Sequence, residues 1–141
     1  MTKYLFDASS IFEALVRGRA EVLSGNFTLE LARYELGNVV WKRRSLIGDL
    51  GREDALRILG LLKKALRIME VLGVECREAE ILKIAENLGV TFYDACYVAM
   101  ANIKDAALVT EDKKLKRKAE KLVKVAELDE LLGNSISTPK P

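Results

Sequence analysis

Four acidic residues stand where carboxylates can act together: Asp7, Glu35, Asp94 and Asp112. Asp7 directly follows the apolar run Tyr4-Leu5-Phe6, and Asp112 also comes shortly after an apolar run. Because open parallel sheets build their sites at the carboxyl ends of strands, we expect Asp7 and Asp112 at one sheet edge. Converging carboxylates repel one another unless cations lie between them, and hard oxygen ligands select Mg²⁺ or Mn²⁺. The set therefore predicts a metal site that activates water and stabilises a phosphoryl-transfer transition state.

Histidine is absent from the chain, and this narrows the possible chemistry. A zinc site is not expected, and neither Ser-His nor Cys-His nucleophilic pairs can form. Cys76 and Cys96 form no Cys-x-x-Cys pair, and both are expected to be small core residues. Acid–base or metal chemistry must therefore fall to carboxylates, lysine, tyrosine or cysteine.

Length and composition predict one soluble, cytoplasmic domain. The chain has 141 residues, half of them hydrophobic, and a net charge of +2, which does not by itself demand nucleic acid. No apolar stretch approaches the roughly 20 residues of a membrane span, and the first residues lack a signal-peptide layout. We expect a folded domain over residues 1–133 and a disordered tail over residues 134–141.

Two strand-to-helix turns are expected to hold Asp7 and Asp112. Residues 3–6 and 106–109 read as short buried strands. Ser10 and Glu13 have capping-box spacing, which places Ser10 at a helix N-cap. Thr110 is expected to cap a helix over residues 113–122, with Glu111 and Asp112 in its first turn. The free N–H groups and the helix dipole there keep an acid ionised.

The other two acids are expected on helices. Glu35 borders the core-facing stripe of a long helix from Leu29 to about Ser45, and simple solvation is the alternative. Asp94 shares a face with Tyr97 in a helix over residues 93–101. An Asp on an apolar stripe is costly unless it is paired or ligated, and helix capping is the alternative.

The remaining pattern alternates strands and helices. Further strands are expected at 26–28, 68–74 and 122–125, and further helices at 52–66, 77–88 and 127–132, the last ended by Gly133. The helix over 52–66 has an unusually wide apolar arc, which indicates either a deep core position or a face that binds a protein partner.

The segments that carry the acids are Asp7-Ala8-Ser9-Ser10, the helix around Glu35, Thr91-Phe92-Tyr93-Asp94-Ala95 and Val109-Thr110-Glu111-Asp112. Together they resemble the four acidic motifs of PIN-domain nucleases. In size and order the chain is most similar to the VapC-like toxins of toxin–antitoxin pairs, over about residues 3–132. The resemblance implies an α/β fold, a three-layer α/β/α domain with a central parallel sheet.

The resemblance also implies a set of roles and partners. Asp7, Glu35, Asp94 and Asp112 would be the catalytic, metal-binding acids, with Ser9 and Thr110 as supporting hydrogen-bonding residues. The implied activity is Mg²⁺- or Mn²⁺-dependent endonucleolytic cleavage of single-stranded RNA. The implied partners are a small inhibitory antitoxin protein and a second copy of the chain in a homodimer.

Several readings stay open. The basic run at 113–124 is either a solvated helix face or a surface that attracts the RNA backbone. Trp41, Tyr93 and Tyr97 either stack on bases or, as the pattern favours, pack in the core. A non-catalytic PIN-like RNA- or protein-binding module would share this fold, although the intact acids argue against it. A receiver-like phosphoryl-transfer domain would need an acceptor Asp that faces a Lys, and the sequence offers no such set.

Overall fold

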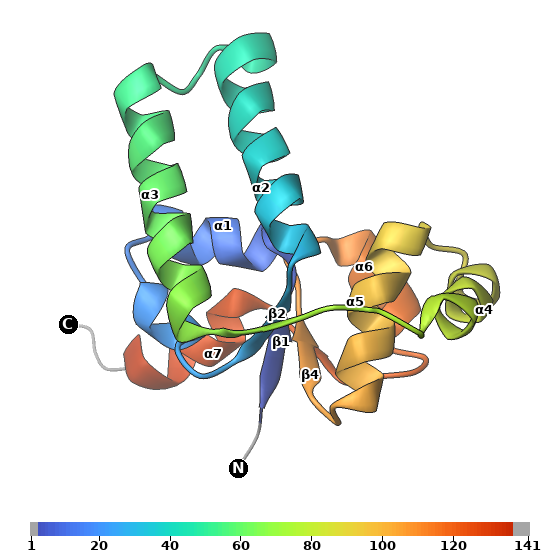
Figure 1. Ribbon diagram of the computed structural model, residues 1–141. Helices are drawn as coiled ribbons and strands as arrows, with labels where there is room; N and C mark the ends of the chain where they lie inside the picture. Colours follow the sequence, from blue (N-terminus) through green and yellow to red (C-terminus); the bar gives the residue numbers. More distant parts are fainter. Residues whose placement is uncertain (1–2, 137–141) are drawn as a thin grey trace.

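The computed structural model describes residues 3–136, with side chains for residues 3–133. At its centre lies a five-stranded sheet in the order β3-β2-β1-β4-β5, and every pairing is parallel. The strands are β1 (Tyr4–Phe6), β2 (Phe27–Leu29), β3 (Glu70–Leu72), β4 (Ala107–Val109) and β5 (Val125–Ala126). All carboxyl ends therefore meet at one edge of the sheet (Figure 1).

Helices make the crossovers that parallel strands require. They are α1 (Ala8–Val16), α2 (Leu31–Lys42), α3 (Arg52–Ile68), α4 (Glu78–Leu88), α5 (Phe92–Ile103), α6 (Lys113–Ala119) and α7 (Leu128–Ile136). A short 3₁₀ turn, η1 (Ala20–Leu23), precedes β2, and a π-helical turn, η2 (Arg43–Ile47), continues α2. Within residues 3–136, no helix combines the length and the apolar composition that crossing a bilayer requires.

The sheet separates two apolar layers, because successive strand residues point to opposite faces. Leu5 and Leu108 pack with residues of α4, α5 and α6. Their neighbours Phe6 and Val109 pack with residues of α1, α2, α3 and α7. The fold is thus the expected three-layer α/β/α domain with a central parallel sheet.

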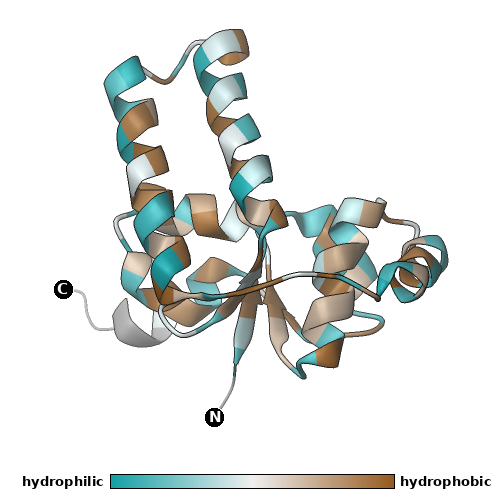
Figure 2. Cartoon of the chain, viewed as in Figure 1, coloured by the Kyte–Doolittle hydropathy of each residue, from teal (hydrophilic) through white to brown (hydrophobic). Residues whose placement is uncertain are grey.

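Helices α2 and α3 extend away from the sheet as two arms (Figure 1). The turn between them is closed by Arg43, whose Nε lies 2.9 Å and 3.0 Å from the carboxylate oxygens of Asp49. Apolar and polar residues alternate along both arms (Figure 2). The wide apolar arc of α3 is divided: Ile58 and Leu62 are buried, whereas Leu56 is 58 % exposed. The buried residues confirm the core position for one part of the arc, and partner binding by the exposed part stays a prediction.

Several boundaries differ from the sequence expectation. Helix α2 begins at Leu31 rather than Leu29. The last strand covers only Val125–Ala126, because residues 120–123 form the turn that follows α6. Helix α7 continues through Gly133 to Ile136, since a glycine inside a helix costs only about 1 kcal/mol and this one keeps a negative φ. Residues 137–141 of the expected tail lie outside the described residues.

The two cysteines occupy different environments. Cys96 is buried in α5, as expected, but Cys76 is exposed, so its expected place in the core is wrong. Cys76 adopts a φ of 69° in the turn before α4, a conformation that an apolar pattern does not reveal.

Candidate active site

A pocket of about 300 Å³ at the carboxyl edge of the sheet is lined by Asp7, Glu35, Asp94 and Asp112. Each acid comes from a different element: the end of β1, helix α2, the first turn of α5 and the loop after β4. The other lining residues are Ala8, Ser9, Asn38, Val39 and Tyr97. Within the described residues, no three Asp, Glu or Cys side chains form a compact metal-ligand cluster, so the acids face one pocket without touching as a group.

Asp7 is the buried anchor of this pocket, with 6 % of its surface exposed. Its Oδ1 accepts hydrogen bonds from Ser9 Oγ (2.7 Å), the Ser10 amide (3.0 Å) and Ser10 Oγ (3.1 Å). Its Oδ2 accepts a 2.5 Å hydrogen bond from Thr110 Oγ1. Both oxygens are therefore held in fixed positions by neighbouring donors.

Asp7, rather than Ser10, is the N-cap of α1, so the expected capping box is wrong. Asp7 has the extended backbone that an N-cap needs (φ −89°, ψ 179°), because it still continues β1. Ser10 lies in the first turn instead, and its hydroxyl lies 2.8 Å from the Val109 carbonyl oxygen. This contact connects the β1–α1 turn to β4.

The cap of α6 also differs from the expected residue, by two positions. Asp112, not Thr110, is the N-cap, and its Oδ1 accepts from the amides of Lys114 (3.0 Å) and Leu115 (3.1 Å). Thr110 is fully buried and accepts from the Asp112 amide while its hydroxyl donates to Asp7. The expectation failed because Thr and Asp are both good N-caps, and only the backbone geometry selects between them.

Ser9 completes the connection between the two strand ends. Its hydroxyl donates to Asp7, accepts a 3.0 Å hydrogen bond from the Glu111 amide and lies 3.3 Å from Thr110 Oγ1. Ser9 and Thr110, the two residues expected to support the site, thus both contact Asp7. This network fixes the loop at 110–112 against the start of α1.

Glu35 is held by a partner that the sequence reading did not assign. The hydroxyl of Tyr97 donates a 2.8 Å hydrogen bond to Glu35 Oε1, and Tyr97 is 1 % exposed. Its spacing of three residues from Asp94 was the available signal, since both then lie on one face of α5. Asn38 was missed as well, although it stands one helical turn after Glu35 and lines the pocket.

Asp94 does not cap its own helix. The N-cap of α5 is Thr91, whose Oγ1 accepts a 3.0 Å hydrogen bond from the Asp94 amide. The capping alternative for the Asp94 carboxylate is therefore wrong, and this carboxylate lines the pocket instead.

The pocket concentrates negative charge. Burial raises the pKa of Asp7, Glu35 and Asp94 above the ordinary values. Neighbouring carboxylates add to this: the charges of Asp94 and Asp7 raise the pKa of Glu35, and those of Asp112 and Asp7 raise the pKa of Asp94. In residues 3–133, none of these acids forms an ion pair with Lys or Arg. A set of carboxylate oxygens with no Lys or Arg paired to it fits a hard divalent cation.

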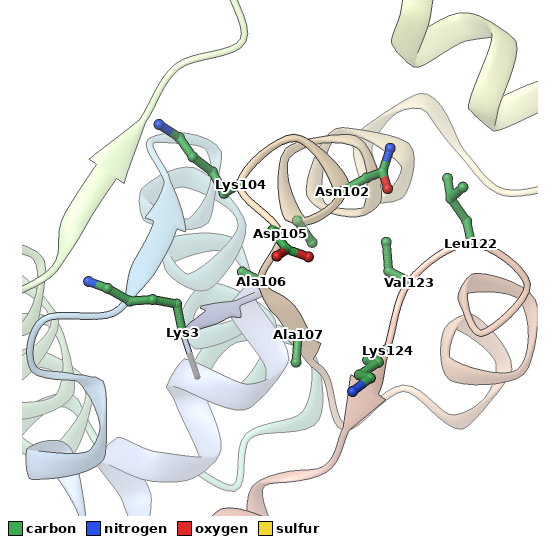
Figure 3. A pocket seen from close by; sticks show the side chains of 10 residues that line it. Lys3, Asn102, Lys104, Asp105, Ala106, Ala107, Leu122, Val123 and Lys124 are labelled. Atoms are coloured by element: carbon green, nitrogen blue, oxygen red, sulfur yellow. The ribbon is translucent and has the colours of Figure 1, made fainter. Parts of the chain in front are cut away.

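A larger hollow lies elsewhere, at the amino edge of the sheet. It measures about 620 Å³, and its walls include Asp105, Lys124 and Ala107, the first residue of β4. Figure 3 shows Lys3 and Lys104 pointing away from it, and their Nζ atoms lie 5.1 Å and 5.7 Å from the Phe27 ring centroid. This hollow has none of the four acids, so it is not the candidate active site.

Fold and pocket together define a three-layer α/β/α domain with a carboxylate-lined site at the carboxyl edge of a parallel sheet. The family model of the PIN domain matches residues 4–121. The chain belongs to the PIN domain family.

Two curated relatives come from Pyrobaculum aerophilum. Exonuclease VapC9 is 33 % identical over 132 residues, which cover 89 % of this chain and 92 % of the relative. Ribonuclease VapC3 is 39 % identical over 102 residues, 68 % of this chain and 72 % of the relative. The crystal structure of PAE2754 from the same organism superposes with a TM-score of 0.78 at 30 % identity, covering 97 % of this chain and 91 % of that one.

Proposed function

We propose that this protein is a divalent-metal-dependent endoribonuclease that cleaves single-stranded RNA and acts as the toxin of a type II toxin–antitoxin pair. The observation that carries the proposal is the pocket into which four elements of the chain bring Asp7, Glu35, Asp94 and Asp112. The names of the relatives, an exonuclease and a ribonuclease of the VapC type, support nuclease activity.

Mg²⁺ or Mn²⁺ bound by the four acids would supply an activated water and a positive charge at the phosphate. The protein's own contribution is to hold the ligands before binding. Asp7 is fixed through both of its oxygens, Glu35 through Tyr97, and Asp112 through its cap on α6. Such preorganisation avoids rearrangement during the reaction.

Glu35 is the proposed acceptor of the proton from the attacking water. Burial, and then the charges of Asp94 and Asp7, raise its pKa, so its carboxylate is a stronger base than an exposed glutamate. Its Oε1 is occupied by the Tyr97 hydroxyl, which leaves Oε2 to receive a proton.

The arms formed by α2 and α3 are the proposed face for protein partners, namely the antitoxin or a second copy of the chain. Leu46 and Ile47 at the tip are 65 % and 62 % exposed, and Trp41 and Leu56 are 52 % and 58 % exposed. Clustered exposed apolar side chains are typical of protein interaction sites.

Cleavage of single-stranded RNA with Mg²⁺, with Mn²⁺ and with EDTA tests the proposal. The wild type should cut internally with either ion and not with EDTA. Asp94→Asn should lose cleavage, since the loss of one transition-state contact typically costs about 3 kcal/mol or more. The matched control is Asp54→Asn, which changes an exposed acid of α3 paired with Arg57. Equal cleavage by wild type and Asp94→Asn would contradict the proposal.

A further inference from the structure

A second, apolar pocket of about 200 Å³ lies at the same carboxyl edge of the sheet. Its walls come from the end of β2, the end of β3 and the start of α5. The lining residues are Leu29, Glu30, Leu31, Leu72, Gly73, Val74, Phe92, Tyr93 and Cys96. The only charged side chain among them, Glu30, is paired with Arg33 at 2.6 Å, so the pocket wall carries no unpaired charge.

This apolar pocket adjoins the acidic one. Tyr93 of the apolar pocket is the chain neighbour of Asp94 in the acidic pocket. The apolar pocket lies over β2 and β3, the acidic one over β1 and β4, and β1 pairs directly with β2, about 4.8 Å away.

Two aromatic side chains at the rim remain accessible. Tyr93 is 61 % exposed and Phe92 is 39 % exposed, at the first turn of α5. The sequence pattern favoured a core position for Tyr93. That interpretation is wrong, because this side chain reaches solvent. Aromatic faces that reach solvent beside an apolar hollow are the usual platforms on which single-stranded nucleic acids stack their bases.

We propose that this apolar pocket binds one nucleobase of a single-stranded RNA whose neighbouring phosphate lies at the four acids. A nucleotide joins a flat, largely apolar ring system to a charged phosphate, and the two adjoining pockets match these halves. The volume of the apolar pocket agrees with one nucleobase. About 200 Å³ is below the roughly 300–1,000 Å³ of sites for drug-sized ligands and suits a single ring system. The inference rests on the proposed function and adds a base-recognition site to it.

The test measures binding to a short single-stranded RNA in Ca²⁺, with one nucleotide in turn made abasic. For the wild type, the abasic change should raise Kd about tenfold at one position only. Tyr93→Ala should raise the Kd of the intact RNA by about the same factor. Tyr93→Ala should also be insensitive to the abasic change at that position, because coupled contacts are not additive.

The matched control is Tyr34→Ala, which removes a tyrosine that is 67 % exposed on α2 and lines neither pocket. It should leave Kd unchanged. Any of three results overturns the inference. The first is an unchanged Kd for Tyr93→Ala, the second is that the effects of Tyr93→Ala and of the abasic change on Kd multiply independently, and the third is that the wild type binds no RNA. A shift of Tyr93→Ala from dimer to monomer in sedimentation with unaltered RNA affinity also overturns it, since the pocket would then bind a second copy.

Cleavage in Mg²⁺, measured separately on the same RNA, distinguishes this inference from the proposed function. Cleavage that is insensitive to base removal at every position refutes the pocket and supports the nuclease. Position-specific binding without any cleavage supports the pocket and refutes the nuclease.

Discussion

Tyr97 and Glu35 join α5 to α2 through a 2.8 Å hydrogen bond between residues 62 positions apart in sequence. The donor is in the core and the acceptor faces the pocket, so the packing of α5 sets the position of Glu35. The bond also favours the ionised carboxylate, because it lowers the pKa of Glu35 against the effect of burial.

Tyr97→Phe should therefore change the pH dependence of cleavage as well as its rate. Loss of the donor raises the pKa of Glu35 further, so the acid limb of the pH–rate profile should move to higher pH. The free energy of unfolding should fall by about 1 kcal/mol, the net value of one hydrogen bond. Tyr34→Phe is the control, and a pH profile that does not move would show that Tyr97 has only a packing role.

Thr110→Val tests the buried network of Asp7. The substitution keeps the shape but removes the donor to Asp7 Oδ2 and the acceptor of the Asp112 amide. A buried carboxylate oxygen without a partner should cost about 1–3 kcal/mol of unfolding free energy. Thr110→Ser retains the hydroxyl and should recover most of this loss. Equal melting temperatures for the two variants would contradict the role given to the Thr110 hydroxyl.

The sequence predicted the layered fold because the strands and most helices have distinct apolar patterns. Leu5 and Phe6 illustrate this, since adjacent apolar residues are what a strand buried on both faces needs. It also predicted the four acids as a set, because Asp7 and Asp112 stand shortly after expected strands and Asp94 stands near the start of an expected helix.

The details of the pocket could not be read in the same way. Thr110 and Asp112 are both suitable caps, so the choice between them depends on backbone angles that the tertiary contact with Asp7 imposes. The Tyr97–Glu35 bond depends on how closely α2 and α5 approach, and periodicity within one helix carries no information about its neighbour. Trp41 and Tyr93 were expected in the core for a similar reason, since an aromatic residue at helical spacing does not reveal whether another element covers it.

The α3 arm provides a prediction about association. Leu56 and Leu59 are 58 % and 36 % exposed, so replacing both by Ser should leave the melting temperature nearly unchanged. Binding to an antitoxin peptide, or self-association measured by sedimentation, should weaken because the exposed apolar face is lost. Leu62 is 4 % exposed and serves as the contrasting site, where Leu62→Ser should strongly destabilise the fold. Unaltered association of the Leu56/Leu59 variant would exclude this face as a binding surface.

The acidic pocket predicts that the metal-free protein loses stability as pH rises. Asp7, Glu35 and Asp94 have folded-state pKa values raised above their ordinary values of 3.8, 4.5 and 3.8. Between each ordinary value and the raised one, the folded state binds more protons than the unfolded state. The free energy of unfolding therefore falls as pH increases through that window. Three surface acids have lowered pKa values because each is paired with a base: Glu21 with Arg19, Asp49 with Arg43 and Glu127 with Lys116. These acids make the free energy of unfolding rise with pH, but only in the pH range below their ordinary pKa values.

Asp94→Asn removes one of the repelling charges while it keeps the shape of the side chain. In EDTA at neutral pH this variant should melt at a higher temperature than the wild type, and the difference should shrink as pH falls and the carboxyl groups become protonated. Mn²⁺ should stabilise the wild type by linkage, by about 2.7 kcal/mol at a concentration of a hundred times its Kd, and Asp94→Asn much less. Asp54→Asn should follow the wild type in both buffers. Thermal melts in EDTA and in Mn²⁺ measure all of these differences. If the wild type does not respond to Mn²⁺ and Asp94→Asn is no more stable in EDTA, the four acids do not share a metal site.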